Sequence, residues 1–136
     1  ILMLDSDAGS PIAAPVRKPL PDRRPSITVP QALGPMEFST TISFYPDTGL
    51  PGEVFADGQK EGSVMAHLLS DACVVVSIAL QHGIPPEALA KSLGRAVGWD
   101  WKTGKEAAGG PASVIGVICE KLVPPFPEDQ AEEGAA

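Results

Sequence analysis

The sequence has 136 residues, the length of one domain, and a formal net charge of −7 at pH 7. This charge argues against nucleic-acid binding as the main function, because phosphate contacts require clustered Lys and Arg side chains. No uninterrupted apolar run approaches the roughly 18 residues that cross a bilayer, and residues 1–4 (ILML) are too short for a signal peptide. We therefore expect a cytoplasmic protein without a membrane partner.

Residues 1–25 are predicted to form a flexible, proline-rich arm. Four prolines between residues 15 and 25 remove amide donors and oppose both helix and central strand. The four basic residues in the same stretch fit a solvated linker, or a tether for an acidic partner or nucleic acid.

The next segment predicts antiparallel strands. Residues 26–29 form a short strand that Pro30 ends. Residues 36–45 alternate between apolar and polar side chains, with positions 36, 38, 40, 42 and 44 on one face, which is typical of a half-buried strand. Residues 46–49 (PDTG) form a turn, and residues 50–56 return as the second strand of a hairpin.

Residues 57–63 (DGQKEGS) link the hairpin to a helix. The segment is an ordinary connection, or a loop that holds a phosphate at the helix N-terminus, where free amides attract anions. The glycine spacing of a P-loop is absent. The candidate ligand-binding residues of this loop are Gly58, Lys60, Gly62 and Ser63.

Residues 62–83 predict the central helix of the domain. Ser63 is a suitable N-cap, Gly83 can end the helix, and no proline or glycine lies between them. At 100° per residue, one side of the helix is an apolar stripe. The stripe consists of Met65, Leu68, Leu69, Ala72, Val76 and Ala79.

The second half of this helix is apolar nearly all round, which predicts burial on every side by other helices or by a second subunit. Val74 and Ile78 lie on the side that is polar one turn earlier. We expect these two residues to form the interface of a homo-oligomer with two-fold symmetry.

The rest of the chain predicts two more helices. Residues 84–94 form a helix that Gly94 ends and whose leucines, Leu89 and Leu93, cover the central helix. Ser113 caps a last helix over residues 113–123 with Val114, Val117 and Ile118 directed inward, and residues 124–136 form an acidic disordered tail.

A glycine-rich loop over residues 95–110 contains both tryptophans of the chain, Trp99 and Trp101. These indoles pack on the core or on a partner, or they stack on a base and complete a nucleotide site with the loop before the helix.

No pattern in the sequence predicts catalysis, a metal or a cofactor. Ser63, His67 and Asp71 follow one another on one helix face and do not converge as a catalytic triad does. Cys73 and Cys119 are expected to be buried free thiols.

The order of the hairpin, the long helix and the short helix resembles the TSCPD domain family over residues 35–123. The most specific segments are residues 52–55 (GEVF), 62–63 (GS) and 80–94 (LQHGIPPEALAKSLG). The family is named for a Thr-Ser-Cys-Pro-Asp segment before the last helix, where this chain reads GPAS at residues 110–113. The serine keeps the capping role, but the cysteine is missing.

Together these features predict an α+β domain over residues 26–123, in which a short antiparallel sheet packs against about three helices around one long central helix. The resemblance implies a stand-alone bacterial or phage domain associated with adenosylcobalamin-dependent ribonucleotide reductases. Its role would be accessory or regulatory in deoxyribonucleotide metabolism, with the reductase as partner and without thiyl-radical chemistry of its own. Two alternatives stand beside it: a self-associating structural protein of phage or mobile-element type, and a nucleotide-binding module.

Overall fold

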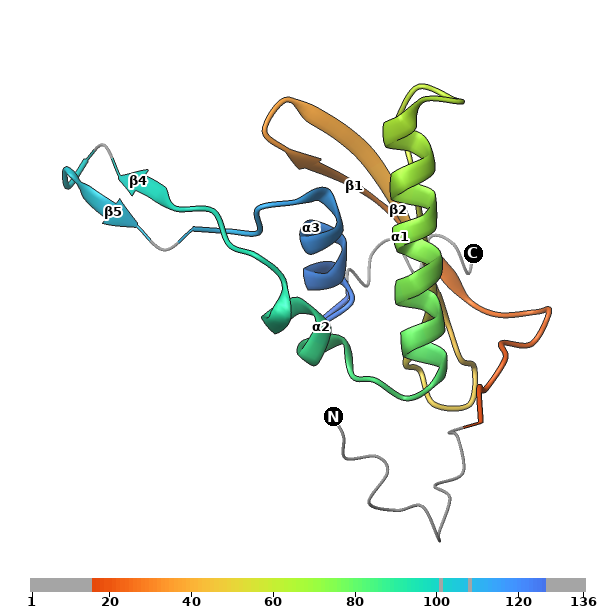
Figure 1. The fold of residues 1–136 in the computed structure, drawn as a ribbon. Coiled ribbons are helices and arrows are strands. Elements are labelled where there is room, and N and C mark those ends of the chain that lie inside the picture. Colours follow the sequence, from red (N-terminus) through yellow and green to blue (C-terminus); the bar gives the residue numbers. More distant parts are fainter. Residues whose placement is uncertain (1–15, 101, 108, 127–136) are drawn as a thin grey trace, which may run out of the picture.

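In the computed structural model, which describes residues 16–100, 102–107 and 109–126, a three-stranded antiparallel sheet packs against helices (Figure 1). The elements in chain order are β1 (Ser26–Leu33), β2 (Met36–Phe44), β3 (Pro51–Asp57), α1 (Val64–Gln81), α2 (Pro86–Ser92), β4 (Gly98–Asp100), β5 (Lys105–Ala107) and α3 (Val114–Lys121). This arrangement confirms the predicted α+β fold with one long central helix.

The sheet has the order β1-β2-β3, with β2 in the centre. Ile42 of β2 pairs with Ile27 of β1 and with Val54 of β3, and all three side chains are buried. The predicted β2–β3 hairpin is confirmed, and so is the burial of Phe38, Thr40, Ile42 and Phe44 on one face of β2.

The prediction that Pro30 ends the first strand was wrong. β1 continues through Pro30 to Leu33, and Pro30 pairs with Ser39 of β2. A proline is tolerated there because β1 is an edge strand, in which a missing amide donor does not interrupt the sheet.

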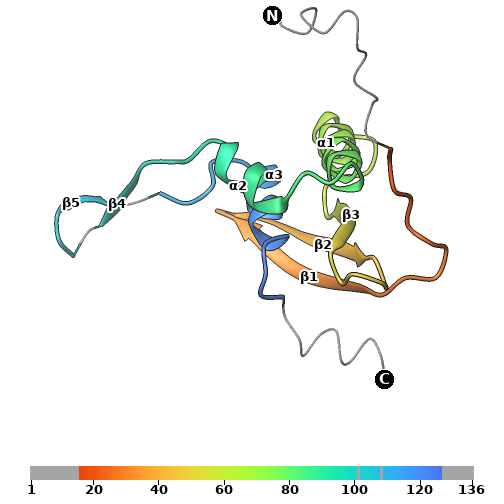
Figure 2. The same ribbon diagram turned by 90° about the horizontal axis from the view of Figure 1, so that it is seen from below.

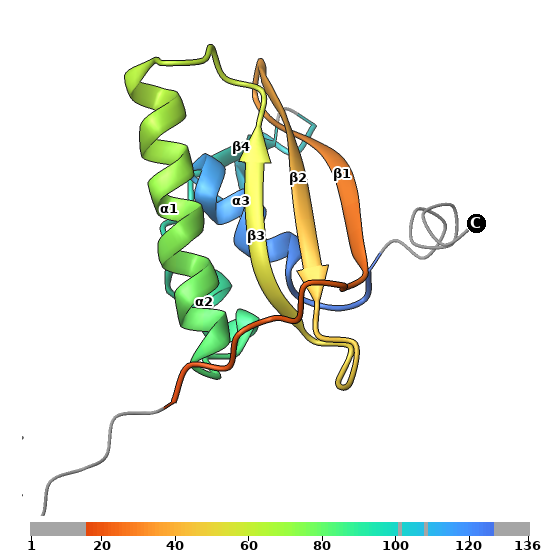
Figure 3. The same cartoon turned by 90° about the vertical axis from the view of Figure 1, so that its right-hand side faces the viewer.

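Helix α1 begins and ends as its capping residues predict. The Oγ atom of Ser63 accepts a hydrogen bond from the Ala66 amide at 3.1 Å, and Gly83 has a φ of 88° just after the C-cap. The helix runs antiparallel to β3 along the edge of the sheet (Figure 3).

The predicted apolar stripe of α1 is only partly the buried side. Met65 and Leu68 are 42% and 61% exposed, whereas Val76 is buried as expected. The residues that are buried are Leu69, Cys73, Val76, Ser77, Leu80 and Gln81. Their centre is rotated by about a quarter turn from the predicted stripe, because the helix faces an edge strand as well as the sheet face.

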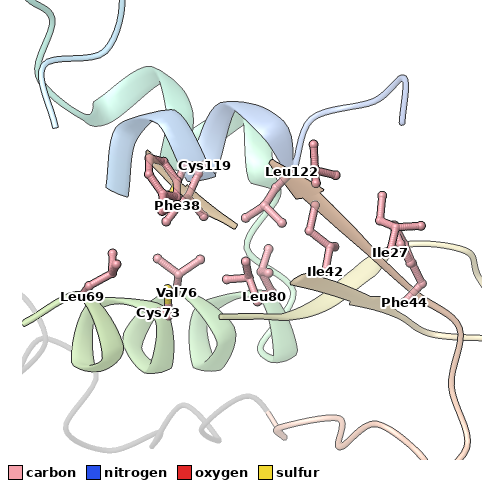
Figure 4. Packing of buried hydrophobic residues seen from close by; sticks show 13 residues of the cluster. Ile27, Phe38, Ile42, Phe44, Leu69, Cys73, Val76, Leu80, Cys119 and Leu122 are labelled. Atoms are coloured by element: carbon pink, nitrogen blue, oxygen red, sulfur yellow. The ribbon is translucent and has the colours of Figure 1, made fainter. Parts of the chain in front are cut away.

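The core lies between α1, the sheet and α3. Figure 4 shows Leu69, Val76 and Leu80 of α1 directed toward side chains of β2 and α3. Cys73 and Cys119 are buried free thiols, as predicted, and Ile118 of α3 is fully buried.

By length and mean hydropathy (1.7), α1 is apolar enough to cross a membrane. A search for an uninterrupted apolar run misses this property because polar residues divide the helix. In the structure its buried residues extend from Leu69 to Gln81 and pack on the sheet and α3. One side of α1 is therefore part of the core, and 33% of the helix is buried in total.

The two remaining helices lie together. α2 packs mainly against α3, and Leu89 and Leu93 are partly buried at the edge of the core, so the expectation that they cover α1 was wrong. α3 has the predicted N-cap, with the Gly116 amide donating to Ser113 Oγ at 3.1 Å. Seen from below, α2 and α3 lie together on one side of α1 (Figure 2).

Between α2 and α3, the chain makes a long excursion. β4 and β5 form a separate two-stranded hairpin that projects away from the rest of the domain (Figure 1). Its base is held by hydrogen bonds from Ala96 N to Gly110 O and from Ala112 N to Gly94 O. α2 ends at Ser92, with Leu93 as its C-cap, so Gly94 belongs to this base and does not end the helix.

The predicted domain limits stay predictions. Residues 1–15 and 127–136, which contain most of the arm and of the acidic tail, lie outside the described residues.

Candidate functional site

The loop before α1, predicted as a ligand site, has clear local roles. The Gly58 amide donates to Asp57 Oδ1 at 2.8 Å, and a Cβ atom on Gly58 would lie 2.8 Å from the Cα atom of Phe38. The Ser63 amide donates to Lys60 O at 3.1 Å. Gly58 and Ser63 therefore shape the connection between β3 and α1, whether or not a ligand binds there.

The tryptophan that the structure describes, Trp99, lies away from this loop (Figure 1). Trp99 belongs to β4, and Trp101 lies outside the described residues. The β4–β5 hairpin and the loop before α1 lie on different sides of the domain in Figures 1 and 2. Among the described residues, Trp99 is thus apart from the loop before α1 (Figure 1), and nucleotide binding stays a prediction.

The edge of β3 is covered by polar side chains of α1. Ser77 Oγ accepts a hydrogen bond from Val54 N at 3.0 Å and donates to Val54 O at 3.1 Å. Gln81 Nε2 donates to Gly52 O at 2.9 Å. An edge strand would otherwise leave these backbone groups unpaired, so α1 takes the place of a fourth strand.

The spacing of this contact follows from helix and strand geometry. Four helical residues rise about 6 Å, and two strand residues rise about 6.6 Å. Side chains four apart on α1 therefore meet alternate residues of β3: Gln81 meets Gly52, Ser77 meets Val54, and the thiol of Cys73 lies against the backbone of Ala56.

Sequence reasoning missed this contact. Ser77 and Gln81 are buried although they are polar, with 7% of each residue exposed. The available signal was the repeat of small or polar residues at positions 73, 77 and 81, within the most apolar half of the helix.

Residues 52–55 (GEVF), the most specific part of the resemblance, have separate roles. A Cβ atom on Gly52 would lie 2.5 Å from Cε2 of Tyr45, so only glycine fits beneath that ring. Glu53 pairs with Arg24 at 2.8 Å, and Val54 is in the core. Phe55 is 51% exposed on the opposite side of the strand.

The described end of the arm, residues 16–25, contacts the domain at Gln81. Arg17 Nε donates to Gln81 Oε1 at 2.6 Å, and Lys18 N donates to Gln81 O at 2.9 Å. The hydroxyl of Tyr45 donates to the backbone oxygen of Lys18, and burial raises the pKa of Tyr45. Gln81 thus connects the arm, α1 and β3.

A first surface groove lies between β3 and α1. We call it the Phe55 groove; its lining includes Arg17, Glu53, Phe55, Val74 and Ile78. Val74 and Ile78, the predicted interface residues, are 53% and 36% exposed. The chain's own helices therefore leave them accessible, which keeps the interface prediction open.

A second groove is almost entirely apolar. This apolar groove lies between α1, the start of α3 and the β1–β2 turn, and its lining includes Leu33, Met36, Met65, Leu68, Val114 and Ile115. Ser113 also lines it, so the segment that corresponds to the family's cysteine motif lies at its rim.

Two observations bear on chemistry. Burial raises the pKa of both thiols, Cys73 and Cys119, to about 11. Such thiols are protonated at neutral pH and are poor nucleophiles. Among the described residues, no group of three or more His, Cys, Asp or Glu side chains is arranged to hold a metal ion.

The comparison with protein families gives one match. A family model described as "TSCPD domain" matches residues 16–122. The matched region begins within the arm, where Arg17 and Lys18 contact Gln81. No solved structure matches the chain.

Several curated proteins are similar to part of the chain. A vitamin B12-dependent ribonucleotide reductase of Streptantibioticus cattleyicolor is 45% identical over 73 residues, which cover 54% of this chain and 12% of that protein. The enzyme of the same name from Streptomyces coelicolor has the same identity, and 7% of it is covered. That of Rhodopirellula baltica is 37% identical over 75 residues, 55% of this chain and 7% of the relative. The matched segment thus spans 7% to 12% of the length of these relatives.

Proposed function

The chain belongs to the TSCPD domain family, and we propose that it is an accessory or regulatory binding module of a vitamin B12-dependent ribonucleotide reductase. In this proposal it acts in the cytoplasm, in deoxyribonucleotide synthesis, and the reductase is its partner. The reaction itself takes place on the partner.

One observation carries the proposal. The segment shared with the reductases is 45% identical over 73 residues, although it makes up only a small part of each of those proteins. A segment of this kind, attached to a large enzyme and matched by a domain with its own core, fits a module that binds rather than the part that reacts.

The side chains of the domain support a binding role. Its two thiols are buried, with the pKa of each raised to about 11, so they are poorly suited to thiol exchange. In the family segment at residues 52–55, Gly52, Glu53 and Val54 have partners within the domain, whereas Phe55 is half exposed beside Arg17 and Val74. We place the contact with the reductase at this Phe55 groove, because an exposed aromatic ring beside charged side chains is typical of a binding surface.

The test is direct binding to the reductase of the organism that encodes the chain. The two purified proteins are mixed at about 20 μM, and gel filtration with light scattering measures whether they co-elute. Ribonucleotide reduction is then measured with and without the chain. We expect a stable complex and a changed turnover, and two separate peaks with unchanged turnover would contradict the proposal.

A variant pair locates the contact. Phe55→Glu adds a charge to the Phe55 groove, and Val97→Glu adds the same charge at a residue that is 78% exposed elsewhere. We expect Phe55→Glu to weaken binding at least tenfold and Val97→Glu to bind like the wild type. Equal binding by both variants would place the contact on another surface.

A further inference from the structure

The outer side of α1 carries an apolar strip that the described residues leave uncovered. Val75 is 67% exposed, Leu68 61% and Met65 42%. Together with smaller residues they lie at intervals of three and four positions, which places them along one face of the helix. We call this face the α1 seam; it consists of the exposed residues Met65, Leu68 and Val75, the partly exposed alanines Ala72 and Ala79, and His82 at the C-cap.

The seam alternates large and small side chains in a way that complements itself. If a second copy of α1 lies antiparallel across it, with a two-fold axis between Ala72 and Val75, Leu68 faces Ala79 of the other copy. Ala72 then faces Val75. Leu68 and Val75 therefore each meet an alanine in the middle of the seam, where a small side chain opposite a large one lets two helices pack closely, and Met65 faces His82 at either end.

Charge also favours a second copy. The chain has a net charge of −7, yet α1 contains one residue with a full charge, Asp71, and it lies beside the seam and not on it. An oppositely charged partner would have nothing to recognise there. Two acidic chains can approach along this face with little local repulsion.

The seam alone is smaller than a standard interface, and the adjoining apolar groove enlarges it. An 18-residue helix is about 27 Å long, and a strip about 12 Å wide gives roughly 300 Å² per chain. A standard interface covers about 800 Å² per partner. The apolar groove adjoins the seam through Met65 and Leu68, so Val114 and Ile115 extend the same surface.

We propose that two copies of the chain associate through the α1 seam, antiparallel about a two-fold axis between Ala72 and Val75. The interface lies a quarter to a third of a turn around α1 from Val74 and Ile78, the pair predicted from sequence. It is independent of the proposed reductase complex, which uses the Phe55 groove.

The first test is the oligomeric state of the full chain. Sedimentation velocity between 1 and 100 μM measures the wild type, Leu68→Glu/Val75→Glu, and the control Val74→Glu/Ile78→Glu on the other flank of α1. We expect a wild-type dimer with a dissociation constant in the micromolar range. The seam variant should dissociate at least 100-fold more easily, and the control should stay dimeric.

The second test reads the register and does not depend on the stability of charged variants. Leu68→Cys and Ala79→Cys chains are oxidised separately and as a mixture, while the native thiols are protected by burial. We expect the mixture to form many more intermolecular disulfides than either variant alone.

Four results would overturn the inference. The first is a wild type that is monomeric at 100 μM, and the second is a dimer that only the Val74→Glu/Ile78→Glu control loses. The third is that disulfides form mainly between two copies of the same cysteine variant. The fourth is a monomer that floats with phosphatidylcholine vesicles, because lipid would then cover the seam.

Discussion

Two faces of α1 differ in the kind of side chain that each one buries or exposes. The side against β3 contains Ser77 and Gln81, which are polar and buried, whereas the open side contains Leu68 and Val75, which are apolar and exposed. This is the reverse of the usual amphipathic helix in these positions.

The difference shows that the kind of side chain buried on a helix face depends on the groups against which that face packs. The edge of β3 offers unpaired amide and carbonyl groups, and a hydroxyl or amide side chain can satisfy them where an apolar side chain cannot. The open side has no such requirement in one chain. The described residues leave its apolar side chains exposed, and we propose that a second copy covers them.

The largest effect is expected for two consecutive valines on different faces of α1, about 100° apart around the helix. Val76 is 6% exposed and Val75 is 67% exposed. Val76→Asp should unfold the domain, because an unpaired buried charge costs several kcal/mol, on the order of 3–5. Urea denaturation followed by circular dichroism measures this loss.

Val75→Asp is the matched control, and at 1 μM its stability should stay within about 0.5 kcal/mol of the wild type. A Val76→Asp protein that unfolds cooperatively with the same urea midpoint as the wild type would contradict the assignment of Val76 to the buried side of α1 and Val75 to the exposed side.

The contact between α1 and the edge of β3 is tested by Ser77→Ala. This change leaves Val54 N and Val54 O unpaired in a buried place, so the free energy of unfolding should fall by about 1–3 kcal/mol. Ser70→Ala, on an exposed part of the same helix, should change it by less than about 0.5 kcal/mol. Equal effects of the two changes would mean that the edge contact does not stabilise the fold.

Truncation of the arm measures how much its contacts with Gln81, at the C-terminal end of α1, contribute to the free energy of unfolding. We expect this contribution to be smaller than that of Ser77. A chain that begins at Val16 should be as stable as the full chain. A chain that begins at Ser26 loses the hydrogen bonds of Arg17 and Lys18 to Gln81, which should cost about 1–2 kcal/mol. Thermal melting of both truncated chains decides whether the domain boundary lies at residue 26, as the composition predicts, or nearer residue 16.

The smallest effect on stability concerns the thiols. Folding raises the pKa of Cys73 and Cys119 from 9.0 to about 11, so only the unfolded chain loses these protons near pH 9. The stability that the protonated thiols provide is complete near pH 7, begins to fall as the pH approaches 9 and is lost as the pH rises through 11. Between pH 7 and pH 9 the two thiols should together lower the free energy of unfolding by roughly 0.5–1 kcal/mol.

The burial of Cys73 and Cys119 can also be tested by comparing their labelling rate with that of a thiol introduced on the open side of α1. At pH 8, Val75→Cys should react with a thiol reagent within seconds to minutes, whereas the native thiols should react only as the domain unfolds. Fast labelling of both native thiols in the folded wild type would contradict their burial.

The sequence alone determined the elements whose signals are local. The alternation at residues 36–45, the PDTG turn and the Ser63 and Gly83 caps act within a few residues of each other, so the hairpin and α1 follow from them. Ser113 is predictable as an N-cap for the same reason. The resemblance over residues 35–123 likewise depends on the printed order of residues, and the family match confirms it.

Only the tertiary structure decided how these elements meet. In the folded domain, the buried side of α1 is rotated by about a quarter turn from its apolar stripe, and β1 extends past Pro30. Helix α2 packs on α3, and Trp99 lies away from the loop before α1 (Figure 1). The physical reason is that each outcome depends on groups far apart in the chain. The orientation of α1 depends on unpaired backbone groups of β3, 23 to 29 residues away, which no pattern within the helix records.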